Sequence, residues 1–471
     1  MDGHALFREP LMVANVGVSH FGLSLEAQGV RTAQVAWRPP ADAKLSFLLR
    51  KTAGSDFSRR VDAANGRVLE ALLAGDPRWI GVKPAGEAIP GFTGNMILHA
   101  GPPISWDRMC DVQKNGILGG LMHEKLAGSY GEALRLVLDG KADIRSANDM
   151  GAIGAGVGIT TFSMPVNVCE DRTTGKEAWC IPFEGRSGLG AWGVYNAEVE
   201  ANLKMLEETF MPAVDGVLRA NGGISVKNII TQGLQMGDEN HTRQTAEGLL
   251  LVAEIVPMLL DSGLEKDVSN LCVKTFLSSE RWFHPLGMAG SFAVIKSAKG
   301  TEFSTVVTAI DSNGVDTGIK VCDMGERWFI ADAPPMTGQF LSSKWGPDDV
   351  LPYLGGSTVT EVAGLGAFSA AAAPVVLRLR GGGWREAKAQ SEEMMAITVG
   401  TNHNYPIPLL DFNGPPIGID IRKVVETGIT PICHGGIISK EGGQAGAGAA
   451  RFPMKIYTEA LRAFFDKHGI N

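Results

Sequence analysis

The sequence lacks clusters of positive charge. No run of Lys or Arg exceeds two residues in the 471-residue chain, and the formal net charge is −8 at pH 7. Proteins that bind nucleic acid usually carry a basic patch or stripe on one face. We therefore expect no nucleic-acid partner.

Cysteine and histidine are also sparse. The six cysteines are scattered without a Cys-x-x-Cys pair, and none of the nine histidines lies three to five residues from another. This spacing argues against a zinc ribbon, a disulfide framework and a histidine-built metal site, and it is typical of a reducing cytoplasm. We expect no cofactor and no metal, although an ion held by carboxylates alone stays open.

Long apolar runs are missing as well. The longest uncharged stretches, Met150–Cys169 and Val362–Leu377, are interrupted by Gly and Pro. The amino-terminal residues contain neither a basic region nor an apolar region. A membrane-spanning helix needs about 20 mostly apolar residues, and a secretory signal needs both of those regions. We expect a cytoplasmic protein with no membrane segment.

Familiar catalytic motifs are absent too. The chain contains no Gly-x-Ser-x-Gly elbow and no Ser-x-x-Lys pair, and its glycine-rich segments lack the Gly-Lys-Ser/Thr ending of a P-loop. The first two motifs present a nucleophile, and the third cradles nucleotide phosphates. If the chain performs acyl chemistry, these absences favour direct displacement over a covalent intermediate.

Glycine, in contrast, is abundant, with 60 of 471 residues against an average near 7%. The densest cluster, His434–Gly448, holds six glycines in fifteen residues. Because glycine weakens helices and strands, we expect a loop here, either a cradle of backbone N–H groups for an oxyanion or phosphate or simply a flexible surface loop. The residues of the predicted cradle are Gly435, Gly436, Lys440, Gln444 and Gly446.

Hydrophobic periodicity predicts a mixture of helices and strands. Residues 11–40 have the pattern of a strand, a helix and a second strand, and residues 304–322 that of a hairpin. Residues 197–298 have an almost wholly helical pattern, including a helix predicted over 239–260, and a last helix is expected at about 453–468.

These patterns together predict a multi-domain α+β fold with a central helical domain or insertion. The expected parts are a small N-terminal βαβ element at 1–60, an α/β domain at 61–196, a helical domain at 197–300 and an α/β domain with the glycine-rich loop at 301–471.

The segment Gly237–Arg243 carries the strongest candidate for proton transfer. On the predicted helix, Asp238 and His241 share a face, and a carboxylate beside imidazole raises its basicity and fixes its tautomer. Glu239 and Arg243 share a face in the same way. A purely structural interpretation is also open, with Asp238 as an N-cap and a surface ion pair between Glu239 and Arg243.

Two further segments place polar groups beside glycine. In Gly325–Phe329, Glu326 and Arg327 precede Trp328, and an arginine there could clamp a carboxylate or serve as a structural ion-pair partner. Around Gly151, the glycines that follow Asn148 could expose backbone donors to a pocket. Packed turns would give the same pattern.

Four motifs resemble those of one family, the YlbE-like (AllG) proteins. They are Gly237–Arg243, Gly325–Phe329, Ile421–Pro431 and Lys440–Gln444. The resemblance runs in the same order from about Asn65 to the carboxyl end, whereas Val13–Pro40 resembles an element of FdrA-like proteins and of longer family members. The Lys440–Gly448 loop resembles that of one family member but looks about two residues shorter.

The resemblance implies a subunit of the oxamate carbamoyltransferase of allantoin degradation, a purine nitrogen catabolic pathway. Its small-molecule substrates would be oxamate and carbamoyl phosphate, interconverted with oxalurate and phosphate. Its partners would be AllH-like and FdrA-like subunits and further copies of itself.

Such a reaction needs a phosphate cradle, donors for an oxyanion and a cationic clamp for a carboxylate. We assign the cradle to the glycine-rich cluster with Lys440, the clamp to Arg243 or Arg327, and proton transfer to His241 oriented by Asp238. Two alternatives stay open: hydrolysis of a ureido or cyclic amide compound, and a non-catalytic structural subunit of the same complex.

Overall fold

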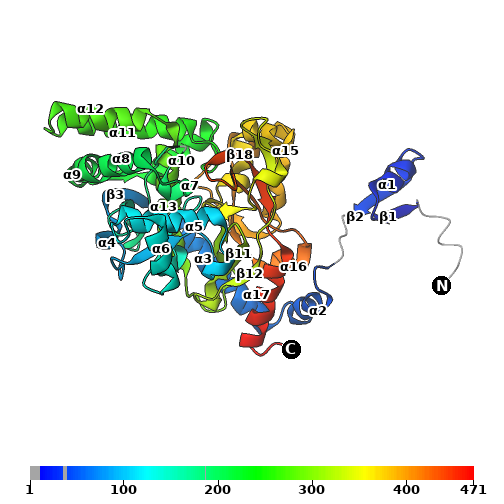
Figure 1. Cartoon of the computed structure of the whole chain (residues 1–471). Helices are drawn as coiled ribbons and strands as arrows, with labels where there is room; N and C mark the ends of the chain where they lie inside the picture. Colours follow the sequence, from blue (N-terminus) through cyan, green and yellow to red (C-terminus); the bar gives the residue numbers. More distant parts are fainter. Residues whose placement is uncertain (1–10, 36–39, 186) are drawn as a thin grey trace, which may run out of the picture.

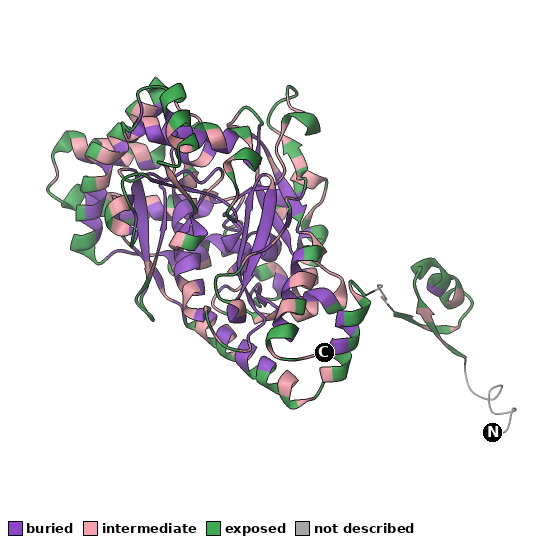
Figure 2. Cartoon of the chain, turned by 60° about the horizontal axis from the view of Figure 1, so that its bottom comes forward, coloured by how far each residue is buried: buried purple, intermediate pink, exposed green. Residues whose placement is uncertain are grey.

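The computed structural model describes residues 11–35, 40–185 and 187–471. It is a mixed assembly of helices and several small sheets, which confirms the predicted α+β class (Figure 1). The buried residues concentrate on the sheets and on the helix faces packed against them (Figure 2). Within the described ranges, no helix combines the length and apolar composition needed to cross a membrane.

The N-terminal unit is a strand, a helix and a parallel strand, as predicted. It consists of β1 (Met12–Val16), α1 (Ser19–Glu26) and β2 (Arg31–Val35). The predicted pattern extended to residue 40, and residues 36–39 lie outside the described residues.

A five-stranded sheet organises the first half of the remaining chain. Its order is β6 (Ala152–Ile153), β8 (Lys176–Cys180), β7 (Pro165–Asp171), β3 (Pro77–Pro84) and β9 (Ile224–Ser225). A separate parallel pair joins β4 (Met96–His99) to β5 (Asp143–Ser146). The helices of this half are α2 (Ala43–Thr52), α3 (Asp56–Ala74), α4 (Ala85–Ala88), α5 (Asp111–His123), α6 (Tyr130–Leu138) and α7 (Leu189–Trp192).

The predicted helical block is present between residues 197 and 298. It comprises α8 (Ala197–Met205), the π-helical η4 (Leu206–Phe210), α9 (Met211–Asn221), α10 (Val226–Gln235), α11 (Thr245–Asp261), α12 (Lys266–Leu277) and α13 (Phe283–Ala298). Helices α11 and α12 lie side by side at one edge of the molecule (Figure 1). The apolar α13 packs against β7 and β8, which joins this block to the sheet.

The second half contains the predicted hairpin within a four-stranded antiparallel sheet. Its order is β12 (Phe329–Asp332), β11 (Asp316–Val321), β10 (Val307–Asn313) and β14 (Leu354–Gly355). The other elements are β15 (Thr398–Thr401), β16 (Pro416–Ile419), α14 (Val359–Val362), α15 (Trp384–Met395), α16 (Ile421–Thr427) and α17 (Met454–Lys467), the last being the predicted final helix. Short 3-10 segments complete the chain, among them η5 (Glu280–Trp282), η8 (Gly366–Ala372) and η9 (Pro374–Arg380).

The glycine-rich cluster forms strands, so the expected loop is wrong. Strands β17 (Ile432–Ile438) and β18 (Gln444–Arg451) pair as an antiparallel hairpin, and β13 (Thr337–Phe340) pairs with β18 on its other side. A Cβ added at Gly446 would lie 2.4 Å from the carbonyl oxygen of Gln339. Glycine is therefore used here for close packing rather than for flexibility.

Candidate functional site

A pocket lies where the helical block meets the β17–β18 hairpin. Its cavity volume is about 80 Å³. Segments far apart in the sequence line it: residues 155–156, 181–184, 191–192, 241–242, Arg281, 284–285, Leu354, Ser357, 435–436, Ile438, Gln444 and Ala447. The pocket thus collects imidazole, carboxylate, guanidinium and hydroxyl groups on a largely apolar wall, as ligand pockets usually do.

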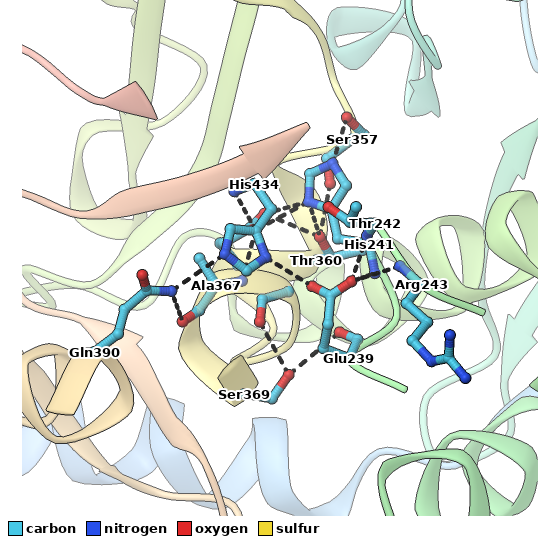
Figure 3. Close-up of polar contacts among 12 residues, drawn as sticks. Glu239, His241, Thr242, Arg243, Ser357, Thr360, Ala367, Ser369, Gln390 and His434 are labelled. Atoms are coloured by element: carbon cyan, nitrogen blue, oxygen red, sulfur yellow. Dashed lines mark hydrogen bonds and ion pairs between the residues drawn. The ribbon is translucent and has the colours of Figure 1, made fainter. Parts of the chain in front are cut away.

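The loop that carries His241 is held by one carboxylate. Glu239 is fully buried, and its Oε1 accepts the backbone N–H groups of His241 (3.2 Å), Thr242 and Arg243 (2.8 Å) (Figure 3). The predicted helix over 239–260 therefore begins only at Thr245, and the segment before it is an irregular loop. The loop fixes the backbone of His241 directly in front of the pocket.

His241 connects a serine to a carboxylate. Its Nε2 lies 3.0 Å from Ser357 Oγ, and its Nδ1 lies 2.9 Å from each carboxylate oxygen of Glu361. Thr360 Oγ1 lies 2.9 Å from the same Nδ1 and donates to Glu361 Oε2. If Nδ1–H donates to Glu361, the lone pair of Nε2 faces the serine hydroxyl (Figure 3).

The surroundings increase the basicity of the His241 imidazole. Burial lowers the pKa of this imidazole, but the carboxylate of Glu361 outweighs burial and raises the pKa above its ordinary value of 6.5. His284 stacks on it with ring centroids 5.5 Å apart. Burial, His241 and Arg281 lower the pKa of His284 to about 3, so this second ring is neutral near pH 7.

A second histidine–carboxylate pair lies behind the first. Glu239 Oε2 accepts from His434 Nδ1 at 3.0 Å, and His434 Nε2 lies 3.2 Å from the side-chain nitrogen of Gln390 (Figure 3). The backbone N–H of His434 donates to Glu361 Oε1 at 3.0 Å. The two pairs are therefore linked in one buried network, which restricts the positions that His241 can adopt.

The pocket lining also contains Glu184 and Arg281. Oε2 of Glu184 accepts the backbone N–H groups of Gly190 (2.8 Å) and Ala191 (3.1 Å), whereas Oε1 is buried without a hydrogen-bond partner among the described residues. Burial raises the pKa of Glu184 to about 7. Nη1 of Arg281 donates to Gln444 Oε1 at 3.4 Å, and its positive charge acts on both His241 and His284.

We expect Glu184→Gln to remove a pH dependence of stability. Below its raised pKa of about 7, Glu184 keeps its proton in the folded protein, whereas the unfolded chain releases it above the ordinary value of 4.5. Rising pH between these values therefore favours unfolding, by on the order of 3 kcal/mol over the window. The temperature of thermal unfolding should therefore fall less steeply between pH 4.5 and pH 7.5 for Glu184→Gln than for the wild type. A variant of the exposed Glu198 should behave like the wild type. Equal slopes for Glu184→Gln and the wild type would contradict the raised pKa.

The pocket collects several of the residues predicted from the sequence. His241, Gly435, Gly436 and Gln444 all line it. Asp238, which was expected to orient His241, instead accepts the backbone N–H of Glu247 at 2.8 Å and lies 3.2 Å from Arg243 Nε. The predicted orienting role therefore belongs to Glu361, because the segment before Thr245 is not helical and the shared face does not form.

The structure places the other predicted residues elsewhere. Lys440 donates to the carbonyl oxygen of Asp348, and Gly446 lies within β18. Nε of Arg243 donates to the carbonyl oxygen of Gly237, and its guanidinium points away from the two histidines (Figure 3). These three residues lie outside the pocket lining.

A second group of predicted residues lies around the β11–β12 sheet. Glu326 forms ion pairs with Lys299 (3.2 Å) and the fully buried Lys320. Arg327 lines a separate, open depression beside α17. Gly151 adopts a positive φ next to the ammonium group of Lys296. Glu326, Arg327 and Gly151 therefore lie outside the pocket lining that contains His241, whereas part of the predicted cradle lies within it.

Several polar residues of the site were not predicted from the sequence, among them Glu184, Arg281, Ser357 and Glu361. One signal was available for Arg281, since Arg281–Trp282 repeats the arginine–tryptophan pattern that singled out Arg327. A second signal was the strand–glycine–serine–helix order of residues 354–362. Glu184 and Glu361 stand in no comparable motif.

The fold and the site define an α+β protein with a buried histidine–carboxylate pair beside a pocket. The family model described as oxamate carbamoyltransferase subunit AllG matches residues 143–357. The oxamate carbamoyltransferase subunit AllG of Escherichia coli (strain K12) is 35% identical over 417 residues, which cover 87% of this chain and 99% of that protein. The chain belongs to the AllG family.

Two further proteins are similar over most of their length. The uncharacterized protein YahG of Escherichia coli (strain K12) is 32% identical over 470 residues, or 99% of each chain. The crystal structure of a conserved protein of unknown function from Enterococcus faecalis V583 matches with a TM-score of 0.85 at 30% identity. It covers 88% of this chain and 99% of its own.

Proposed function

We propose that this chain is a catalytic subunit of a cytoplasmic carbamoyltransferase in allantoin nitrogen catabolism. The reaction is the interconversion of oxalurate and phosphate with oxamate and carbamoyl phosphate. Family membership supports this reaction class, and the observation that carries the proposed catalytic role is the placement of His241, held by Glu361 at the wall of the pocket. AllH-like and FdrA-like subunits and further copies of this chain are its proposed partners.

The pocket supplies the groups that carbamoyl transfer needs. An attacking amide nitrogen must lose a proton, and a leaving phosphate oxygen must gain one. His241 Nε2, at the pocket wall, performs both transfers in turn. Arg281 provides positive charge for the phosphate or for the oxamate carboxylate in the same cavity. Arg281 thus takes the role first assigned to Arg243 or Arg327.

Phosphate release tests the proposal. The purified chain, alone and combined with AllH-like and FdrA-like subunits, is given carbamoyl phosphate and oxamate. Phosphate and oxalurate are then followed together. We expect equal amounts of both products in at least one assembly. If every assembly releases no oxalurate and the chain binds neither substrate in calorimetry, the chain is a structural subunit.

We expect Arg281→Gln to weaken the binding of carbamoyl phosphate. Hydrogen bonds to charged groups contribute about 1.5–3 kcal/mol, so KM should rise by roughly 10- to 150-fold. Arg327→Gln is the matched control, because Arg327 also precedes a tryptophan but lines the separate depression. Steady-state kinetics of both variants show which of the two arginines binds carbamoyl phosphate. A larger KM effect in Arg327→Gln would return the clamp to Arg327.

Hydrolysis of a ureido or cyclic amide compound is the second candidate. The contact between Ser357 Oγ and His241 Nε2 favours it, because serine hydrolases use the same pairing. Phosphate dependence separates the two functions. A hydrolase cleaves oxalurate in phosphate-free buffer, whereas a carbamoyltransferase requires phosphate for the same cleavage.

A further inference from the structure

Ser357 stands at a turn between a strand and a helix. Strand β14 ends at Gly355, whose φ is +135°, and α14 begins at Val359. A Cβ at Gly355 would lie 3.1 Å from the backbone nitrogen of Gly156, and the positive φ is a conformation that glycine adopts without strain. The turn thereby directs Ser357 to the pocket wall, where the side chain is buried.

The contacts of Ser357 match the arrangement that activates a serine nucleophile. Its hydroxyl lies 3.0 Å from His241 Nε2, and the opposite nitrogen of that ring lies 2.9 Å from Glu361. A nucleophile, a base within hydrogen-bond reach and a third group that orients the base form the arrangement by which serine enzymes are recognised. All three side chains are buried, and two of them line the same pocket.

The residues around Glu361 fix this geometry. Oε1 accepts the backbone N–H of Ala367 at 2.9 Å, and a Cβ at Gly366 would lie 2.1 Å from the same oxygen. Because Gly366 has no side chain, the Glu361 carboxylate can lie close to the backbone there while it contacts the His241 imidazole. A carboxylate held in this way can stabilise the imidazolium that forms when the serine loses its proton.

We propose that Ser357 is the nucleophile of the reaction and that the carbamoyl group passes through a covalent carbamoyl-Ser357 intermediate. This proposal rests on the proposed carbamoyltransferase function and replaces the direct displacement expected from the motifs. It assigns His241 as the base for Ser357 and Glu361 as the residue that positions His241.

The two half-reactions balance. In the first, Ser357 Oγ forms a bond to the carbamoyl carbon, the bond from that carbon to the phosphate oxygen breaks, and the hydroxyl proton passes through His241 Nε2 to the leaving phosphate. In the second, the amide nitrogen of oxamate attacks the carbamoyl carbon and the bond to Oγ breaks. The amide proton returns through His241 to Ser357, and oxalurate leaves.

Trapping the intermediate tests the proposal in the assembled enzyme. The complex is mixed with carbamoyl phosphate without oxamate, quenched in acid and examined by intact mass and peptide mapping. We expect one carbamoyl group on the peptide that contains Ser357, and we expect oxamate to discharge it as oxalurate. Ser357→Ala should form no adduct and lose at least about 100-fold in turnover. Ser269→Ala is the matched control, because both serines are 8% exposed and Ser269 lies on α12.

A serine-directed fluorophosphonate gives a readout that is independent of the substrate. We expect labelling at Ser357 that is slowed in His241→Ala and absent in Ser357→Ala, with circular dichroism confirming that each variant is folded. Oxalurate formation by wild type without an adduct, together with Ser357→Ala retaining more than a tenth of the activity, overturns the nucleophile and leaves the proposed function standing. Labelling of Ser357 without any oxalurate formation supports the nucleophile and overturns the carbamoyltransferase.

Discussion

Replacing His241 with Ala should lower kcat of the assembled enzyme by about 10²–10⁴, the usual contribution of a general acid–base group. In the proposed mechanism His241 Nε2, which lies 3.0 Å from Ser357 Oγ, transfers the proton, and its Nδ1 is held by Glu361 at 2.9 Å. The substitution removes the base but leaves Arg281 and the hairpin wall in place. KM for carbamoyl phosphate should therefore change much less than kcat.

The measurement is steady-state formation of oxalurate at saturating substrate. His403→Ala is the control, since that histidine is exposed and lies outside the pocket lining. Thermal unfolding shows whether the His241 variant keeps its fold. Turnover within threefold of wild type would remove His241 from the mechanism.

Local patterns predicted much of the fold. The hairpin at 304–322, the helical block and the last helix were predicted from patterns among neighbouring residues. Strands β10 and β11 confirm the hairpin, helices α8 to α13 confirm the block, and α17 confirms the last helix. The loop predicted for the glycine-rich cluster was wrong for a nonlocal reason. Gly446 and Gly448 are required by the close approach of β13, and Gly435 by that of Tyr353, whose Oη would lie 2.8 Å from a Cβ at Gly435. A partner strand about 100 residues away leaves no trace in local composition.

The site could be predicted only in part for the same reason. His241 stood beside charged residues, and Gly435, Gly436 and Gln444 stood in the cluster, so each carried a local signal. The partner of His241 carried no local signal in the sequence. The sequence offered Asp238 three residues away, whereas the carboxylate that contacts the ring is Glu361, 120 residues later. Only the folded chain brings these two residues together.

The positive charge illustrates a different limit. Arg281–Trp282 and Arg327–Trp328 are the same dipeptide, and both stand next to a glutamate. Arg281 lies in η5 before α13 and lines the pocket, whereas Arg327 lines an open depression beside α17. A motif of two residues identifies the chemistry that is available, but the tertiary position selects which copy can meet a substrate. The domain boundaries predicted from the same patterns stay predictions.

Replacing Glu239 with Ala should destabilise the fold by about 3–5 kcal/mol, the usual cost of removing one partner of a buried charged pair. Glu239 Oε1 accepts three backbone N–H groups of the His241 loop, and its Oε2 accepts from His434. Alanine leaves these donors buried and unpaired. Since the backbone of His241 is among them, activity should fall together with stability. Urea unfolding at pH 7 measures the change, and Glu254→Ala, on the exposed face of α11, is the control.

The pH dependence separates this role from a simple loss of packing. Burial raises the pKa of Glu239, but His434 and His241 outweigh burial and hold the pKa below its ordinary value of 4.5. A carboxylate with a lowered pKa contributes stability that is complete above the unfolded value and is lost as the pH falls through the folded value. The difference in unfolding free energy between wild type and Glu239→Ala should therefore shrink below about pH 4.5. A difference that stays constant from pH 7 to pH 3.5 would mean that the charge of Glu239 does not hold the loop.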